Sequence, residues 1–149
     1  MAGKDWYRID KKWQEKFDGI ISFQTLSWLP EYKEPIKKLV ELRPNWIAIS
    51  SLFYDGDIEY TNKVKNYYRP KADKPYTECY YNIYSINRVR EFFAELGYKK
   101  FEYVPFEIDI DLPKTTKDIG TYTTKTEDGK RIQISAGLML PWYFIVASK

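Results

Sequence analysis

Two short apolar runs separated by a helical pattern constrain the fold of this chain more than any other feature. The first run is "FDGIISFQ", which centres on Ile20, Ile21 and Phe23, and the second is "NWIAISSLFY" at 45–54. Brief continuous runs of this kind are typical of buried strands. Between them, apolar residues recur at helical spacing over 32–42, before a proline that ends the helix. Strand, helix and strand with short connections predict two parallel strands and a right-handed crossover.

A long irregular segment follows from Asp55 to Tyr84 and is rich in tyrosine and lysine. Loops of this length in a compact domain are usually functional, so it is predicted to be a substrate-side excursion with local helix around 58–67. Its aromatic and basic side chains suit stacking on sugars or on single-stranded bases, closure over a small acceptor, or simple packing against neighbouring elements.

The second half of the chain is predicted to contain one helix and then an antiparallel β tail. Ser85 suits the N-cap of the helix and Gly97 its C-terminal stop. Residues 99–112 alternate as a strand with a proline that marks an edge or bulge. The Asp-Gly pair at 128–129 lies between two β-rich arms and predicts a hairpin. The apolar run 142–148 predicts a terminal strand.

The residue types that the chain lacks exclude several classes of protein. It has 149 residues, which suit a single domain, with no histidine and one cysteine, Cys79. Histidine-based triads, histidine zinc sites, multi-cysteine metal sites and an internal disulfide are therefore excluded, and we expect no metal. The lone cysteine is compatible with a reducing cytoplasm, where we expect the protein. No run approaches the roughly 18 apolar residues of a membrane span.

Charge and glycine spacing exclude further classes. The formal net charge of +3 is small, and the basic residues are dispersed, so we expect no nucleic-acid partner. The seven glycines are too far apart for a GxGxxG or P-loop motif, and no GxSxG elbow is present. The chain therefore carries no standard phosphate-binding loop.

A row of carboxylates alternates with apolar residues in "FEIDIDL". Glu107, Asp109 and Asp111 are predicted to share one strand face. Such a row can hold a metal or act as a general base, yet the chain offers no matching ligands elsewhere. A solvated face opposite lysine and arginine neighbours is the favoured interpretation.

The segment "FDGIISFQTLSWLPEYKEPIKKLVELRPNWIAISSLFY", with "LGYKKFEYVPFEIDIDL" and "PWYFIVASK", resembles the carboxyl-terminal half of a class I S-adenosylmethionine-dependent methyltransferase, of the type 11-like group. The resemblance covers nearly the whole chain from Asp5. It implies a Rossmann-like α/β fold: a mixed sheet with parallel strands, then an antiparallel C-terminal pair with an inserted β-hairpin.

The resemblance also implies a cofactor site for S-adenosylmethionine. Asp5 and Trp6 match the acidic and hydrophobic pair that contacts the adenine, although a solvated Asp and a packed loop Trp are an equal alternative. Phe23 and Gln24 match the residues that hold the methionine part, and Trp28 falls near the transferred methyl. A hydrophobic staple for the following helix is the alternative for this turn.

The implied activity is methyl transfer to a small-molecule or sugar acceptor, with Tyr80, Tyr81 and Tyr84 as candidate substrate-binding residues. Alignment of nucleophile, methyl and sulfur is the main task of such a site. Without histidine, the proton acceptor is a carboxylate, a tyrosine or water. Glu107 and Asp57 are the first candidates.

One feature of the family is missing, because its glycine loop and ribose-binding acidic residue would lie before Met1. Three explanations stay open: the chain is a fragment, a partner supplies the rest, or cofactor binding has been lost. An incomplete sheet exposes an apolar edge and face, so we expect a homo-oligomer. The alternative function is a non-catalytic interaction protein derived from a methyltransferase half-domain.

Overall fold

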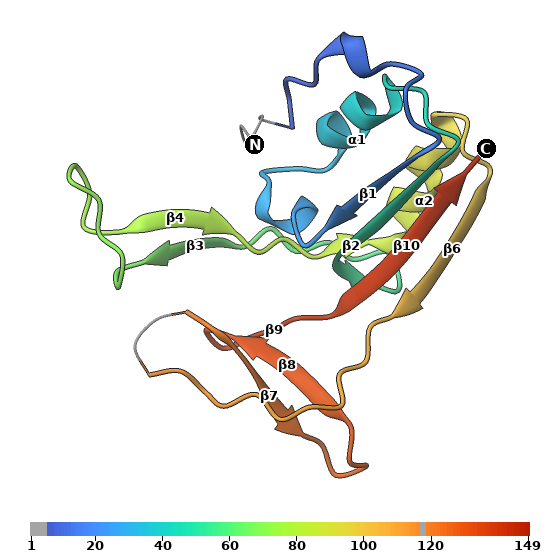
Figure 1. The fold of residues 1–149 in the computed structure, drawn as a ribbon. Helices are drawn as coiled ribbons and strands as arrows, with labels where there is room; N and C mark the ends of the chain where they lie inside the picture. Colours follow the sequence, from blue (N-terminus) through green and yellow to red (C-terminus); the bar gives the residue numbers. More distant parts are fainter. Residues whose placement is uncertain (1–5, 117–118) are drawn as a thin grey trace.

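The computed structural model describes residues 6–116 and 119–149, and strands dominate it (Figure 1). About 36% of the structure is strand and 17% is helical. The largest sheet contains β1 (Gly19–Phe23), β2 (Trp46–Tyr54), β5 (Tyr84–Ser85), β6 (Lys100–Pro105) and β10 (Trp142–Ser148). Two small sheets contain β3 (Lys63–Asn66) with β4 (Thr77–Tyr80), and β7 (Thr121–Lys125) with β8 (Arg131–Ser135) and β9 (Leu138–Met139). The helices are α1 (Lys33–Val40) and α2 (Ile86–Glu95), and two 3-10 turns are η1 (Lys11–Trp13) and η2 (Leu26–Trp28).

The two apolar runs form neighbouring parallel strands, as the sequence predicts. β1 and β2 pair in register from Gly19 opposite Trp46 to Phe23 opposite Ser50. Helix α1 connects them, so this part of the chain is the expected strand, helix and strand. The residue that follows β1 therefore lies at the carboxyl end of a parallel pair.

The antiparallel tail is also confirmed in outline. β10 lies between β2 and β6 and is antiparallel to both. The predicted hairpin at 128–129 joins β7 to β8. Gly129 occupies its turn with φ of 82°, a conformation that glycine adopts at little cost.

The predicted Rossmann-like α/β fold class is wrong. A Rossmann-like domain places helices on both faces of a mainly parallel sheet. Here the structure is mostly β, with two helices among the described residues and small sheets of five, two and three strands. The prediction failed because the segments between the recognised elements form strands of their own, which periodicity did not reveal.

Two local predictions are wrong for related reasons. The helix expected around 58–67 is absent, and Lys63–Asn66 is strand β3, whose residues alternate between exposed and inward positions. Lys63 also pairs with Glu78 of β4 at 3.0 Å, which ties the two strands together. The strand expected over 99–112 ends at Pro105, and the chain then crosses to the small sheet, where the Leu112 N–H bonds Thr123 Oγ1 at 2.8 Å.

Helix α2 has the termini that the sequence predicts. The Ser85 hydroxyl accepts a hydrogen bond from the Arg88 N–H at 3.1 Å, as an N-cap does. Gly97 follows the helix with φ of 92°. None of the helices in the described part of the chain has the length and apolar character that crossing a membrane requires.

The main core lies on one face of the five-stranded sheet, and both helices pack there (Figure 1). Helix α1 contributes Ile36 and Leu39 to this core, and α2 contributes Val89 and Phe93. The strand residues that face them alternate along the chain and are Ile20, Ile47, Ile49, Ile145 and Ala147. In the intervening positions the side chains point to the opposite face.

That opposite face carries no helix among the described residues. We call it the helix-free face and define it by the side chains that it exposes: Ile21, Phe23, Trp46, Val104, Phe144 and Val146. A second, smaller cluster of Leu52, Ile83, Leu140 and Trp142 covers only one end of the sheet. Most of the helix-free face therefore remains open to solvent.

Three tyrosines are buried in the core, and two of them bond to the backbone. Tyr98 donates to the Pro44 carbonyl at 2.7 Å, and Tyr84 donates to the Leu29 carbonyl at 3.2 Å. Burial is the main cause that raises the pKa of Tyr32, Tyr84 and Tyr98 from the ordinary 10.0 to about 12. Each hydroxyl is therefore held in its neutral form by the fold.

We predict alkaline unfolding between about pH 10 and pH 12. Because the pKa values are raised in the folded state, these tyrosines ionise first in the unfolded chain as the pH rises. Their contribution to the unfolding free energy is therefore complete below pH 10 and is lost above it, by about 1–3 kcal/mol for each tyrosine. The measurement is the urea-unfolding free energy against pH. Tyr98→Phe is expected to reduce the alkaline loss, whereas Tyr68→Phe, at a side chain 68% exposed, leaves it unchanged. A flat profile across this range would contradict the prediction.

Candidate functional site

The turn after β1 holds its polar residues at the end of the parallel strand pair. Gln24 has a left-handed backbone with φ of 54°, which is uncommon for a residue other than glycine. Its N–H donates to the Ser50 carbonyl at 2.8 Å, so the turn starts in register with β2. The Thr25 hydroxyl donates back to the Phe23 carbonyl at 3.0 Å. The predicted location of Gln24 at the rim of the sheet is thus confirmed.

A buried pair of serines fixes the turn to β2. Ser27 and Ser51 share a hydrogen bond between their hydroxyls at 2.5 Å. The Ser27 N–H donates to Ser51 Oγ, and the Leu52 N–H donates to Ser27 Oγ, both at 2.9 Å. Ser27 is fully buried, so these groups have no access to water and depend on one another. The turn is therefore a rigid part of the sheet rather than a loose loop.

An open pocket of about 330 Å³ lies beside the turn. Its lining is mainly aromatic and consists of Phe23, Gln24, Ser50, Phe106, Trp142 and Phe144. The Phe144 ring meets the rings of Phe23 and Phe106 edge-on, with centroids 6.2 Å and 5.6 Å apart. We call this hollow the aromatic pocket. It opens at one end of the helix-free face.

Two more of the predicted residues meet on the other side of the turn. Trp28 is about half exposed, and its ring lies 5.7 Å from the ring of Tyr81 at a tilt of 31°. Tyr80 ends strand β4 and is half-buried. Tyr84 differs from both, because it lies in the core with its hydroxyl turned to backbone carbonyls. A role in substrate binding stays a prediction for all three tyrosines.

The remaining cofactor candidates are Asp5 and Trp6. Asp5 lies outside the described residues. Trp6 is half-buried and packs against the main core. The adenine contact predicted for this pair therefore stays a prediction.

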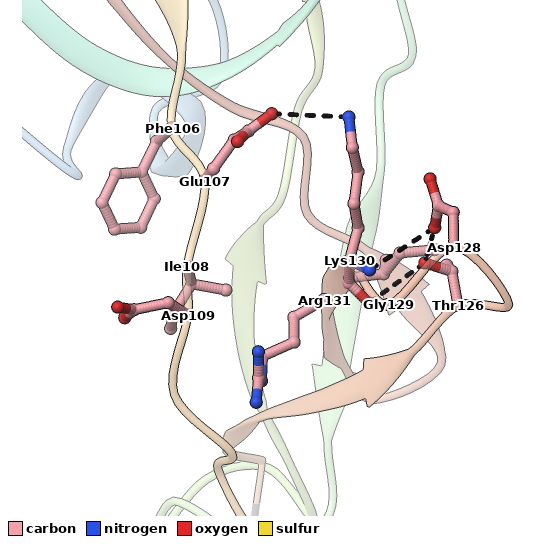
Figure 2. A pocket seen from close by; sticks show the side chains of 10 residues that line it. Phe106, Glu107, Ile108, Asp109, Thr126, Asp128, Gly129, Lys130 and Arg131 are labelled. Carbon is pink, nitrogen blue, oxygen red and sulfur yellow. Dashed lines mark hydrogen bonds and ion pairs between the residues drawn. The ribbon is translucent and has the colours of Figure 1, made fainter.

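A second, charged hollow of about 480 Å³ lies between the segment after β6 and the β7–β8 hairpin, shown in Figure 2. Phe106 lines both hollows. Across this charged cleft, Glu107 and Lys130 face each other with their charged atoms 3.7 Å apart. Both side chains are mostly exposed, so this pair contributes little to stability.

Two carboxylates of the row, Glu107 and Asp111, pair with basic residues of the hairpin, as the favoured interpretation predicts, but the shared strand face is wrong because β6 ends at Pro105. Asp111 accepts from Arg131 at 2.9 Å and 3.2 Å, and Lys125 lies 3.6 Å away. The hydrogen bond from Arg131 is the main cause that lowers the pKa of Asp111. Among the described residues, no group of three or more potential metal ligands is found.

Asp57, the other candidate base, lies in the loop after β2. Its carboxylate is 3.7 Å from Arg88 Nε, and both side chains are exposed. Of the two candidates, only Glu107 adjoins a residue of the aromatic pocket, because its neighbour Phe106 lines that hollow.

Sequence analysis missed most of the pocket lining. Ser50, Phe106, Trp142 and Phe144 come from three different segments, and only the register of β1, β2, β10 and β6 brings them beside Phe23. The one available signal was the continuous apolar run of the terminal strand, which places apolar residues such as Phe144 and Val146 on the face away from the helices as well.

A scan against protein-family models found no match to this chain, and a search of curated proteins found none either. The chemistry proposed for the site therefore depends on its geometry and on the residues themselves.

The serine pair generates a prediction about the stability of the turn. Ser27→Ala leaves the Leu52 N–H and the Ser51 hydroxyl without their partner, so we expect a loss of about 1–3 kcal/mol in unfolding free energy. Ser22→Ala is the matched control, because the Ser22 hydroxyl is buried without a hydrogen-bond partner. Chemical denaturation should show Ser22→Ala to be neutral or stabilising. Equal effects of both variants would contradict the assignment.

Proposed function

We propose that this chain contributes part of the donor site for methyl transfer from S-adenosylmethionine to a small-molecule or sugar acceptor. It would act in the cytoplasm within a larger or oligomeric assembly. The observation that carries the proposal is the rigid polar turn at the carboxyl end of the β1–β2 pair, where Phe23 and Gln24 line the aromatic pocket. The proposal concerns this site and does not require the chain to be a Rossmann-like domain.

The lining of the aromatic pocket suits a sulfonium cation. The faces of aromatic rings attract cations, and the rings of Phe23, Phe106 and Phe144 converge here. The Gln24 side-chain amide supplies both donors and an acceptor at the rim. These groups match a cationic sulfur whose substituents end in an amine and a carboxylate.

The size of the pocket limits how much of the donor this chain would hold. Its volume of about 330 Å³ lies near the lower end of the roughly 300–1,000 Å³ typical of ligand sites. We therefore assign it the sulfonium end of the donor, with the remainder held by other polypeptide. When bound, the sulfonium supplies an activated methyl group.

The residues of this chain would therefore bind and orient the sulfonium end of the donor. The serine-anchored turn fixes Gln24, and the ring cluster excludes water from one side of the pocket. Glu107 is the nearer candidate for holding the proton of an acceptor hydroxyl, although in this structure it faces Lys130.

Calorimetric titration of the full chain with S-adenosylmethionine, which carries the sulfonium charge, tests the proposal. We expect measurable binding to the wild type and about tenfold weaker binding to Gln24→Gly, because the amide is lost while glycine tolerates the left-handed backbone. Glu15→Gly is the matched control, since Glu15 also has a left-handed backbone, with φ of 58°. It should bind like the wild type. No heat from the wild type at about 100 µM protein would overturn the proposal and favour the non-catalytic alternative.

A further inference from the structure

The helix-free face is a continuous apolar surface that crosses four paired strands. Strand register places Ile21, Ala48, Val146 and Glu102 in one row across the sheet. The next row contains Phe23, Ser50, Phe144 and Val104. Paired residues point to the same side of a sheet, so the exposed members of these rows form one patch.

The exposed area of this face approaches that of a protein interface. Ile21, Phe23 and Val104 are each 58–60% exposed, and the other three members are about 36–38% exposed. With the surface areas typical of such side chains, the six expose roughly 600 Å², which is at the upper limit of the about 300–600 Å² found for the largest patch on a monomer. Phe106 and the stems of two flanking charged residues bring the face closer to the ~800 Å² that each partner buries in a standard interface.

The charges on this face favour a second copy over an oppositely charged partner. Among the residues of β1, β2, β6 and β10 that point this way, the charged ones are Lys100 and Glu102. They are two positions apart on edge strand β6, with opposite signs. A twofold axis can therefore place Glu102 of each copy near Lys100 of the other. Among the described residues of this face there is no cluster of basic side chains that would select phosphates.

We propose that two copies of this chain associate through the helix-free face, with the two sheets packed face to face about 10 Å apart. Each copy then buries the apolar rows of the other, as the two sheets of a β-sandwich do. This inference does not depend on methyl transfer, because it rests on the apolar area and the charges of the face. The aromatic pocket opens at one end of the same face, so the second copy narrows its mouth.

Sedimentation velocity of the full chain across about 1–100 µM tests the proposal, because interfaces of this size span micromolar and tighter affinities. We expect a monomer–dimer equilibrium in the wild type. Ile21→Asp and Val146→Asp should each weaken it by about 100-fold, since each places a carboxylate in the apolar interface. Val146 lies on β10, whose two edges are already paired, so its effect cannot arise from strand pairing at an open edge.

Ile58→Asp is the matched control, because Ile58 is 48% exposed but lies in the loop after β2. It should dimerise like the wild type. Far-ultraviolet circular dichroism of all variants checks that they fold, which is expected because each replaced side chain is partly exposed. The proposal would be overturned by open-ended association or by a dimer that Val146→Asp does not weaken. It would also be overturned if the wild type stayed monomeric throughout the range, a result that would point to a different partner for this face.

Discussion

The packing of both helices on one face of a five-stranded sheet is the constraint on which the rest of this structure depends. Burial of that face supplies the main core, and neither helix packs on the other side. Sheets with parallel strands are normally covered on both faces, because their apolar residues point both ways. Here Ile21 and Val146 remain in solvent. The exposed face and the pocket at its end are consequences of this arrangement.

Polar residues tie the irregular part of the chain to this sheet. Asn82 is buried, and its side chain bonds the Leu29 carbonyl and the Asn62 N–H at 2.9 Å and 3.0 Å. Its own N–H donates to the Ser27 carbonyl at 2.9 Å. The turn after β1 is thus held by Ser51 from one side and by Asn82 from the other. A site built there has little freedom to move, which favours precise positioning of a bound group.

Elements with a strong local signal were predictable from the sequence. The Ser85 cap, the turn at Gly129 and the two apolar runs at β1 and β2 all lie where local propensity places them. The β3–β4 sheet was not, because the short alternation around Lys63 resembles a solvated loop. The fold class failed for a related reason, since local patterns do not reveal which sheet face the helices cover. The pocket lining depends on strand register and was beyond reach for all but Phe23 and Gln24.

The distribution of charge indicates which part of the proposed chemistry this chain can perform. Glu107, Asp111 and Asp57 each face a lysine or arginine of the hairpin or of α2. The aromatic pocket, by contrast, has rings and one amide but no charged side chain in its lining. Transfer from a sulfonium needs alignment more than acid or base assistance, so a chain that mainly binds and orients is chemically consistent with that role.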